Sequence, residues 1–456
     1  MPPVDGSERR PRIARSAPTS VAGVTDARVA AANTMADLRQ GDLLDGAFDR
    51  RAATLDARDR RWLHELLWGM LRRRGWLDAV LAPRVKGGLA KLDADVVDLL
   101  RLGAYQLLFM GSVPAYAAIA QTVELTKRRD GIGASKLMNA VLRRVDRERD
   151  TLAPEAASDP VETLAQQASH PHWLVQRWVE RWGIESVGKL LAANNEEAPI
   201  TVRPFGITHD ELDATLSGAG VEHERVPLVP DSIRLAGGVA LTELGAFKQG
   251  LLFVQDPAAT LVTQYADIPV GAVVADLCAA PGGKALELSR RASLVVAADR
   301  SMSRTERMLL GFGRLGARNL TLLVSDATAP ALAPVDVVLI DVPCTGTGTF
   351  RRHPDARWRL RVSDFAVLAA TQRAILRAAA TIVKPGGLLV YSTCSLELDE
   401  NDEPIEWFLR EHREFVLEPP SAHAVPASVL DGGLLRVLPQ QHGVDGAFAA
   451  RLRKAG

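Results

Sequence analysis

Hydrophobic positions between residues 25 and 150 recur at three- and four-residue spacing, which is the period of an amphipathic α-helix. The clearest stretches are Arg61–Leu71, Val96–Phe109 and Ala117–Thr126. Short breaks that contain glycine or proline separate them, such as the Gly-rich stretch at 86–88. Residues 25–150 are therefore predicted to form an all-α bundle.

The pattern changes twice beyond this helical part. Residues 151–169 are rich in alanine, proline and acidic residues, which is typical of a linker. Between 170 and 252, the helical stretches His172–Trp182 and Ile184–Asn194 precede strand-like segments, and this favours a small α+β subdomain. Strands rich in valine and leucine then alternate with helices, so residues 253–456 are predicted to form a Rossmann-like α/β domain around a doubly wound parallel sheet.

The composition agrees with a globular protein of several domains. The chain has 456 residues, of which 47% are hydrophobic and 24% charged. It contains no run of about 18 apolar residues of the kind that spans a membrane. Residues 1–24 contain arginine, proline and serine without an apolar core, so we expect a disordered tail rather than a secretory signal.

The charge distribution leaves the question of a nucleic-acid partner open. The formal net charge is zero, which by itself argues against a strongly basic nucleic-acid binder. Arginine and lysine clusters at 72–74, 127–129 and 143–144 lie near the ends of predicted helices. They either satisfy helix carbonyls and the helix dipole or contact phosphate groups, and the sequence favours neither alternative.

The three cysteines of the chain are Cys278, Cys344 and Cys394. This small number, with no Cys-x-x-Cys pair or Cys/His cluster, argues against a disulfide framework and a metal site and fits a reducing cytoplasm. Cys344 and Cys394 follow the predicted strands Val337–Ile340 and Gly387–Tyr391. Ligands of an open α/β sheet bind at the carboxyl ends of its strands, so we expect both cysteines at the functional edge.

A glycine-rich turn joins the predicted strand Val273–Leu277 to the next helix. Such a turn lets the backbone approach a ligand closely, and its free N–H groups favour an anionic or carboxylate group. The turn lacks the spacing of a nucleoside-triphosphate loop, which disfavours that ligand. Its residues are Cys278, Ala279, Ala280, Pro281, Gly282, Gly283 and Lys284.

Aspartates end the next two predicted strands. Asp299 suits the two hydroxyl groups of a ribose, and Asp326 suits an adenine amino group. A Gly-Gly turn is often only a turn, and an aspartate after a strand is often a helix cap. The order and placement of all three signals together nevertheless favour S-adenosylmethionine as the ligand.

Two cysteines beside a methyl donor indicate methylation of a carbon atom. Carbon-5 of cytosine is a poor nucleophile until a thiolate adds to carbon-6 and makes the base enamine-like. A base must then remove the carbon-5 proton, and the thiol must be eliminated. A single buried cysteine is usually a small hydrophobe. Two cysteines at strand ends, next to a predicted methyl donor, favour this covalent chemistry.

Several motifs carry a resemblance to known families. In the helical part these are the stretches at 68–73, 102–107, 114–119, 122–124 and 139–143. With them, residues 25–150 resemble the NusB-like domain, which implies contact with RNA or ribonucleoprotein and no chemistry. In the last domain the motifs are Asp276–Lys284, Asp341–Thr349, Tyr391–Ser395, Glu400–Glu403 and Gln441–Gly446. With them, residues 253–456 resemble the RNA cytosine-5 methyltransferase family of the Fmu/Sun type.

This second resemblance implies roles for individual residues. The loop 278–284 would bind S-adenosylmethionine together with Asp299, Asp326 and Asp341. Cys394 would be the nucleophile that attacks carbon-6, and Cys344 would assist proton removal or product release. Lys284 would orient the region of Asp341 and the bound base.

The resemblance leaves more than one function open. The NusB-like part favours 16S rRNA as substrate over tRNA, which other members of the family methylate. A non-catalytic RNA-binding assembly or antitermination factor is disfavoured by the intact cysteines and aspartates. N-methylation would need neither cysteine, and enzymes of that kind usually show an Asn/Asp-Pro-Pro-Tyr motif, which this sequence lacks. N-methylation is therefore disfavoured. We expect a monomer that uses no metal and contacts no membrane.

Overall fold

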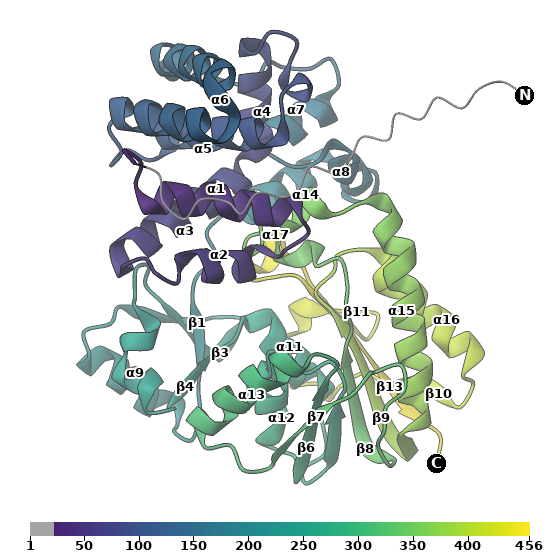
Figure 1. Ribbon diagram of the computed structural model, residues 1–456. Helices are drawn as coiled ribbons and strands as arrows, with labels where there is room; N and C mark the ends of the chain where they lie inside the picture. The colour runs from purple at the N-terminus through teal and green to yellow at the C-terminus, as the bar shows by residue number, and fades with distance from the viewer. Residues whose placement is uncertain (1–21) are drawn as a thin grey trace, which may run out of the picture. The chain divides into compact units, whose positions relative to one another are not determined.

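The computed structural model describes residues 22–456, and the chain divides into two compact units after Arg177. Figure 1 shows the course of the chain. The helix α8 (His172–Asn195) crosses the division and is interrupted by Gly183, whose φ of 75° is not helical. This break agrees with the two separate helices expected at 172–182 and 184–194. Most of the tail expected at residues 1–24 lies outside the described residues.

The first unit is all-α, as the three- and four-residue spacing predicted. Its helices are α1 (Asp26–Arg39), α2 (Leu44–Ala52), α3 (Ala57–Arg72), α4 (Arg74–Leu81), α5 (Ala94–Phe109), α6 (Ala115–Glu148) and α7 (Pro160–Gln167). Short 3₁₀ turns lie at Ala82–Arg84, Leu89–Lys91 and Arg149–Thr151. Helix α5 is buried along most of its length, because the other helices of the unit pack around it.

Arginines of the predicted clusters form ion pairs inside this unit. Arg129 lies 2.7 Å from Asp95, and Arg128 lies 2.7 Å from Glu124. Arg144 lies 2.7 Å from Glu148. At these positions the structure favours the intramolecular alternative over free phosphate-binding side chains.

The stretch 151–169, expected to be a linker, is partly helical. Helix α7 begins at Pro160, and the carboxylate of Asp159 caps it by accepting a hydrogen bond from the Val161 amide at 2.9 Å. Proline at the first helical position and aspartate at the cap are strong start signals. The high alanine and proline content of this stretch predicted a linker and did not indicate the short helix.

The second unit begins with a small antiparallel sheet. Its elements are β1 (Thr201–Pro204), α9 (His209–Gly218), β2 (His223–Val226), β3 (Val229–Leu235), a 3₁₀ turn at Leu241–Glu243, α10 (Gly245–Lys248) and β4 (Leu252–Val254). The strand order is β2-β3-β1-β4. Leu212 and Leu216 of α9 pack on Val202 and Ile233 of the sheet. The α+β character predicted for this segment is confirmed.

The larger sheet of the second unit has the strand order β11-β12-β13-β9-β8-β5-β6-β7, with β10 paired to β13. Its first half consists of α11 (Pro257–Ala266), β5 (Val273–Asp276), α12 (Gly283–Ser289), β6 (Leu294–Asp299), α13 (Met302–Leu315), β7 (Leu320–Val324) and β8 (Val335–Asp341). A 3₁₀ turn (Thr347–Thr349), α14 (Ala356–Arg359), α15 (Val362–Thr381), β9 (Val383–Thr393), a 3₁₀ turn (Leu398–Glu400), α16 (Asp402–Glu411) and β10 (Phe415–Leu417) follow. The chain ends with a 3₁₀ turn (Ala427–Val429), β11 (Leu430–Asp431), β12 (Leu434–Val437), α17 (Pro439–His442) and β13 (Ala447–Lys454).

Strands β5 to β9 are parallel, as predicted, but the sheet continues with antiparallel strands. β12 and β13 are joined by a short connection, which can link only antiparallel neighbours. Helices cover both faces of the sheet (Figure 1). Core residues of α11, α12 and α13 pack on one face, and those of α15 and α16 pack on the other. Buried parallel strands of this kind read as continuous hydrophobic runs in the sequence.

Within residues 22–456, no helix is both long and apolar enough to span a membrane.

Candidate active site

A cleft with a volume of about 320 Å³ opens at the carboxyl ends of β5, β8 and β9. The residues of the predicted site that line it are Cys278, Ala279, Ala280, Pro281, Gly283, Lys284, Asp341 and Cys394. The structure therefore places most of the proposed loop and one of the two proposed catalytic cysteines at the same cleft. Gly282, Cys344, Asp299 and Asp326 are not among the lining residues.

Cys344 and Cys394 lie side by side at this edge. Their sulfur atoms are 3.4 Å apart, although 50 residues separate them in the chain. The parallel pairing of β8 and β9 sets this distance, because the Val342 amide beyond β8 donates to the Ser392 carbonyl at 3.0 Å. The hydrogen bond with Cys394, followed by burial, raises the pKa of Cys344 well above its ordinary value.

Lys284 and Asp341 form an ion pair on the floor of the cleft. The Lys284 Nζ atom lies 2.7 Å from Asp341 Oδ2, and Ser392 Oγ donates to Asp341 Oδ1 at 2.8 Å. Burial opposes the charge of the lysine, but the nearby carboxylate outweighs it and raises the pKa of Lys284. The pair therefore carries a fixed positive and a fixed negative group beside Cys394.

Asp276 is the functional candidate that sequence reasoning missed. It ends β5, is completely buried and lines the cleft, and its carboxylate has no well-aligned hydrogen-bond partner among residues 22–456. Burial, followed by the charge of Asp341, raises the pKa of Asp276 to about 7. Its place at the end of a buried strand, directly before the glycine-rich turn, is the signal that could have identified it.

Cys278 is poorly suited to act as a nucleophile. Burial, followed by the charge of Asp276, raises the pKa of the Cys278 thiol. A thiol with a raised pKa is largely protonated at neutral pH, and only the thiolate is nucleophilic. Of the three cysteines, Cys278 therefore contributes to the wall of the cleft rather than to covalent chemistry.

Asp299 and Asp326 stand farther along the same sheet edge. Asp299 accepts a hydrogen bond from the Ser301 amide at 2.8 Å and lies 2.9 Å from Arg304. Asp326 is exposed and accepts from the Thr328 amide at 2.8 Å. Both carboxylates thus bond to the turn that follows them, which is the local role that the sequence left open for them. Their part in cofactor binding stays a prediction.

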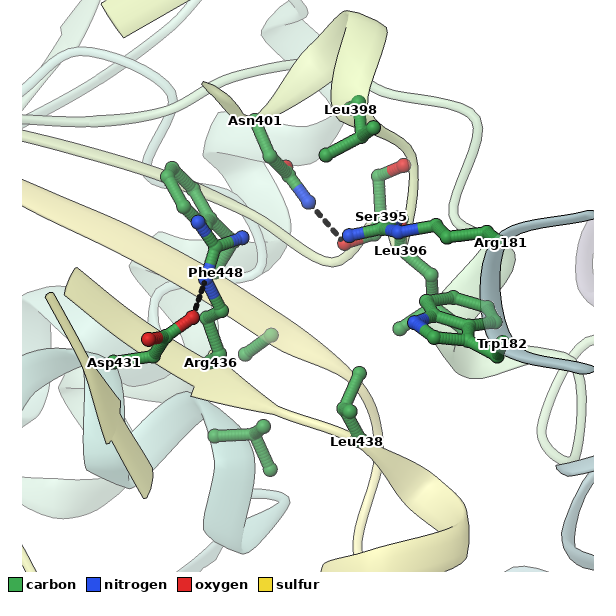
Figure 2. Close-up of a pocket in the computed structure, with 12 residues that line it drawn as sticks. Arg181, Trp182, Ser395, Leu396, Leu398, Asn401, Asp431, Arg436, Leu438 and Phe448 are labelled. Carbon is green, nitrogen blue, oxygen red and sulfur yellow. Dashed lines mark hydrogen bonds and ion pairs between the residues drawn. The ribbon is translucent and has the colours of Figure 1, made fainter. Parts of the chain in front are cut away.

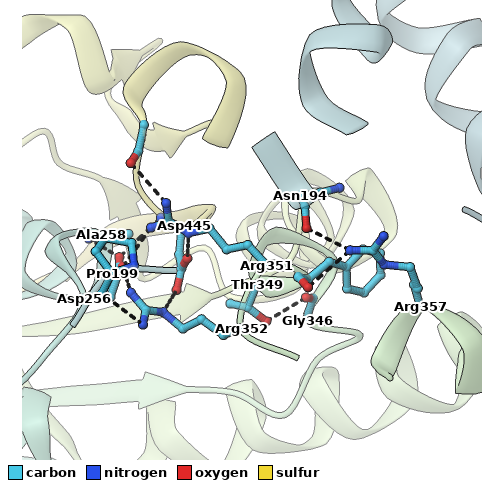
Figure 3. Close-up of polar contacts among 12 residues, drawn as sticks. Asn194, Pro199, Asp256, Ala258, Gly346, Thr349, Arg351, Arg352, Arg357 and Asp445 are labelled. Carbon is cyan, nitrogen blue, oxygen red and sulfur yellow. Dashed lines mark hydrogen bonds and ion pairs between the residues drawn. The ribbon is translucent and has the colours of Figure 1, made fainter. Parts of the chain in front are cut away.

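A buried ion cluster ties three segments around the cleft (Figure 3). Asp256 caps α11 and lies 3.1 Å from Arg351 and 2.5 Å from Arg352. Asp445 lies 2.6 Å from Arg352 and also pairs with Arg351. Each arginine lies more than 90 residues from either aspartate in the chain, so no local sequence pattern indicates the cluster.

Backbone hydrogen bonds connect this cluster to the nucleophile candidate. The Gly446 amide donates to the Gly348 carbonyl at 2.8 Å, and the Gly348 amide donates to the Cys394 carbonyl at 2.9 Å. A β-carbon on Gly348 would lie 2.7 Å from both the Cys394 carbonyl oxygen and the Gly446 Cα atom. Only glycine permits this close approach of three backbone segments.

Glu400 and Asn401 hold the turns that carry the two cysteines. Glu400 is fully buried and accepts from the Thr345 amide at 2.9 Å, next to Cys344. Asn401 donates to the Ser395 carbonyl at 2.9 Å, next to Cys394. Burial raises the pKa of Glu400. These two residues belong to a motif noticed in the sequence, and the structure shows what they contact.

The arrangement is suited to thiol chemistry beside a small polar ligand. A glycine-rich turn, an ion pair and two cysteines face or adjoin one cleft. No group of His, Cys, Asp and Glu side chains able to hold a metal ion is found within the described part of the chain. The cleft can therefore bring a thiol close to a ligand bound at the glycine-rich turn.

Comparison with known families assigns all three parts of the chain. Residues 267–453 match the family described as 16S rRNA methyltransferase RsmB/F. Residues 25–147 match the NusB family, and residues 170–242 match a ferredoxin-like domain of RsmF/B-like methyltransferases.

Curated proteins and solved structures agree with this assignment. The chain is 34% identical to a probable ribosomal RNA small subunit methyltransferase B of Synechocystis, over 91% of this chain and 96% of that protein. It is also 34% identical to the ribosomal RNA small subunit methyltransferase B of Pseudomonas syringae pv. tomato, over 94% of this chain and 96% of that protein. The crystal structure of the protein PH0851 matches with a TM-score of 0.79 and 26% identity, over 94% of this chain and 98% of that chain.

Removing one carboxylate of the ion cluster should destabilise the second unit strongly. In Asp445→Ala, two buried or half-buried arginines lose a partner, so we expect the free energy of unfolding to fall by about 3–5 kcal/mol. Denaturant unfolding measures the change. The matched control is Glu406→Ala, which breaks an exposed pair 3.9 Å from Arg410 and should change the free energy by less than about 1 kcal/mol. Equal effects of the two variants would contradict a structural role for the cluster.

Replacing the buried Asp276 should stabilise the protein in a pH-dependent way. The native state raises the pKa of this carboxyl from 3.8 to about 7, so it binds the proton more tightly than the unfolded chain does. Ionised Asp276 therefore lowers stability increasingly as the pH rises toward 7. We expect Asp276→Asn to raise the free energy of unfolding by an amount that grows from about pH 4 to about pH 7 and is then constant. Asp231→Asn, at an exposed position, is the control. A gain that did not vary with pH would contradict this reasoning.

Proposed function

Because the chain belongs to the RsmB/F family of 16S rRNA methyltransferases, we propose that it methylates carbon-5 of a cytosine in 16S rRNA. It is an S-adenosylmethionine-dependent rRNA methyltransferase by family. The carbon-5 position and the covalent route are our proposal. The single observation that carries them is the 3.4 Å separation of the Cys344 and Cys394 sulfur atoms at the cleft.

The residues of the cleft fit S-adenosylmethionine. Asp276 offers a buried carboxylate toward which no side chain of the described chain donates, and such an acceptor suits the ammonium group of the ligand. At Gly283 an added β-carbon would come 3.0 Å from the Gln255 amide nitrogen, so a larger residue there would crowd the lining of the cleft. We propose that the loop 278–284 and Asp341 bind this molecule, with Asp299 and Asp326 at its outer part.

S-adenosylmethionine supplies an electrophilic methyl group, and the chain must make carbon-5 able to accept it. We assign the nucleophile to Cys394. Its thiolate adds to carbon-6 of the cytosine, which forms a carbon–sulfur bond and moves electron density to carbon-5. After carbon-5 has gained the methyl group, its proton leaves, and the carbon–sulfur bond breaks to restore the aromatic base and the free thiolate.

We assign the removal of the carbon-5 proton to Cys344. In the free enzyme its pKa is high, chiefly because it shares a hydrogen bond with Cys394. Addition of Cys394 to the base converts that sulfur to a neutral thioether, which removes the largest cause of the shift. We propose that Cys344 then acts as the base close to carbon-5, the atom next to the new carbon–sulfur bond.

Lys284 and Asp341 are assigned to orienting the base. Their ion pair is 2.7 Å long, and Ser392 fixes the second oxygen of the carboxylate. A fixed carboxylate can accept from the amino group of cytosine, and a fixed ammonium can donate to its ring nitrogen or carbonyl oxygen. This pairing would distinguish cytosine from uracil, which presents a carbonyl oxygen where cytosine has the amino group.

We propose that the NusB-like part, residues 25–150, and the subdomain at 170–252 contact the rRNA, while residues 253–456 carry the chemistry. The first two parts match the NusB family and a ferredoxin-like domain of RsmF/B-like methyltransferases, and both proposed catalytic cysteines lie in the last part. We further propose that the enzyme acts as a monomer in the cytoplasm, where rRNA is assembled.

Replacing Cys394 should abolish methyl transfer. Cys394→Ala removes the atom that adds to carbon-6, so carbon-5 stays unreactive. Labelled methyl transfer to 16S rRNA, to the assembled small subunit and to tRNA, measured in parallel, tests both the mechanism and the substrate. Ser428→Ala, at an exposed position of the same domain that does not line the cleft, is the control and should leave transfer unchanged. Transfer by Cys394→Ala near the wild-type rate would overturn the assignment, and preferred transfer to tRNA would overturn the choice of 16S rRNA.

Replacing Cys344 should trap the covalent complex. In Cys344→Ala the carbon-5 proton has no base near it, so elimination stalls and Cys394 stays attached to the RNA. Denaturing gel electrophoresis should show a protein–RNA band that resists boiling in detergent. The double variant Cys344→Ala/Cys394→Ala should show no such band. Rapid turnover by Cys344→Ala without an adduct would contradict the role of Cys344.

A further inference from the structure

A second pocket, of about 290 Å³, lies on the other side of the turn that carries Cys394. Figure 2 shows Arg181 and Trp182 on one wall and Arg436, Asp431 and Phe448 on the opposite wall. Ser395 and Leu396, the two residues after Cys394, form part of the lining. This pocket and the cleft described above are thus separated by one turn of backbone, and Ala447 lines both.

Helix α8 is fixed against this turn. Trp178 is buried, and its indole N–H donates to Glu397 Oε1 at 2.8 Å. Arg181 donates to the Leu396 carbonyl oxygen. Trp182 follows Trp178 by four residues, which places both rings on the same face of the helix. The contacts of Trp178 and Arg181 therefore fix the part of α8 that carries Trp182, whose ring lines the pocket.

The walls combine aromatic surface with guanidinium groups. The Arg181 guanidinium lies 4.4 Å from the centre of the Trp182 ring, and the Arg436 guanidinium lies 5.3 Å from the centre of the Phe448 ring. Arg436 is held by Asp402 and by Asp431, which lies 3.0 Å away. Unpaired nucleobases are recognised by stacking on aromatic rings and arginine planes, and their phosphates by arginine. The volume of about 290 Å³ is large enough to accept one base.

We propose that this pocket binds the base of a nucleotide adjacent to the target cytosine, stacked on Trp182. The inference rests on the proposed function, because it takes the base that reacts with Cys394 as its reference point. RNA that enters the cleft must pass the turn 394–396, and the next unpaired nucleotide then meets the pocket on the far side of that turn. Stacking there would hold the target strand in register with the nucleophile and would require a single-stranded segment.

The first experiment measures kinetics on 16S rRNA with and without the aromatic ring. We expect Trp182→Ala to raise the KM for 16S rRNA about 10-fold, since loss of one stacked base weakens binding by about that factor. The kcat and the affinity for S-adenosylmethionine should stay within about twofold, because Trp182 lines no part of the cleft at Cys394. Trp182→Phe keeps an aromatic face and should recover most of the affinity.

The matched control is Trp407→Ala. Trp407 also lies beneath an arginine, with the Arg377 guanidinium 4.6 Å from its ring centre, but it lines neither pocket. Its loss should leave the KM for rRNA unchanged. Thermal unfolding of all three variants identifies any effect of misfolding. An unchanged KM in a folded Trp182→Ala, or an equal rise in Trp407→Ala, would overturn the proposal.

The second experiment maps the two nucleotides directly. Cys344→Ala is incubated with S-adenosylmethionine and a 16S rRNA transcript that contains 4-thiouridine, and is then irradiated and digested. We expect the nucleotide crosslinked to Trp182 to lie next to, or one position beyond, the nucleotide attached to Cys394. An adduct at Cys394 with the Trp182 crosslink elsewhere in the RNA, or with none, would overturn the pocket and leave the proposed function intact. Absence of the Cys394 adduct would instead overturn the proposed function.

Discussion

The buried ion cluster of Arg351, Arg352, Asp256 and Asp445 is the constraint on which the geometry of the cleft depends. Two arginines and two carboxylates are removed from water together, and each carboxylate contacts both arginines. Burial of charge is tolerated only when every partner is in place. The cluster therefore permits one arrangement of the segments before α11, after Cys344 and before β13. The cluster therefore determines which arrangement of the site forms, and it contributes less to the net free energy of folding.

Backbone hydrogen bonds connect this cluster to the turn that carries Cys394. The Gly446–Gly348 and Gly348–Cys394 hydrogen bonds connect the C-terminal segment to the turn after β9. Glu400 and Asn401 then hold the turns of Cys344 and Cys394 from the opposite side. The two sulfur atoms consequently lie within contact distance before any substrate arrives. In the proposed reaction, this arrangement lets one thiol depend on the state of the other, because the adduct at Cys394 removes the main cause of the high pKa of Cys344.

The turn 394–396 contributes to the lining of both the cleft and the pocket at Trp182. Cys394 faces the cleft with the glycine-rich loop, and Ser395 and Leu396 face the pocket with Trp182. A single rigid turn can thus relate the position of the reacting base to that of its neighbour. In the NusB-like unit, by contrast, Arg128, Arg129 and Arg144 form intramolecular ion pairs. Of these pairs, only that of Arg129 with Asp95 joins two helices, whereas Arg128 and Arg144 pair within α6 and stay exposed at its surface.

The sequence by itself determined the elements and the edge of the sheet at which Cys344, Cys394 and the glycine-rich loop stand. Alternation of buried strands with helices is a local pattern, and it places strand ends together in any parallel sheet. Which of these ends share a cleft depends on strand order, and only the tertiary structure decided it. β5 lies beside β8, and β8 beside β9, whereas Asp299 and Asp326 follow strands on the other side of β5. The ion cluster and the place of Trp182 likewise depend on contacts between distant segments, for which a single sequence carries no local signal.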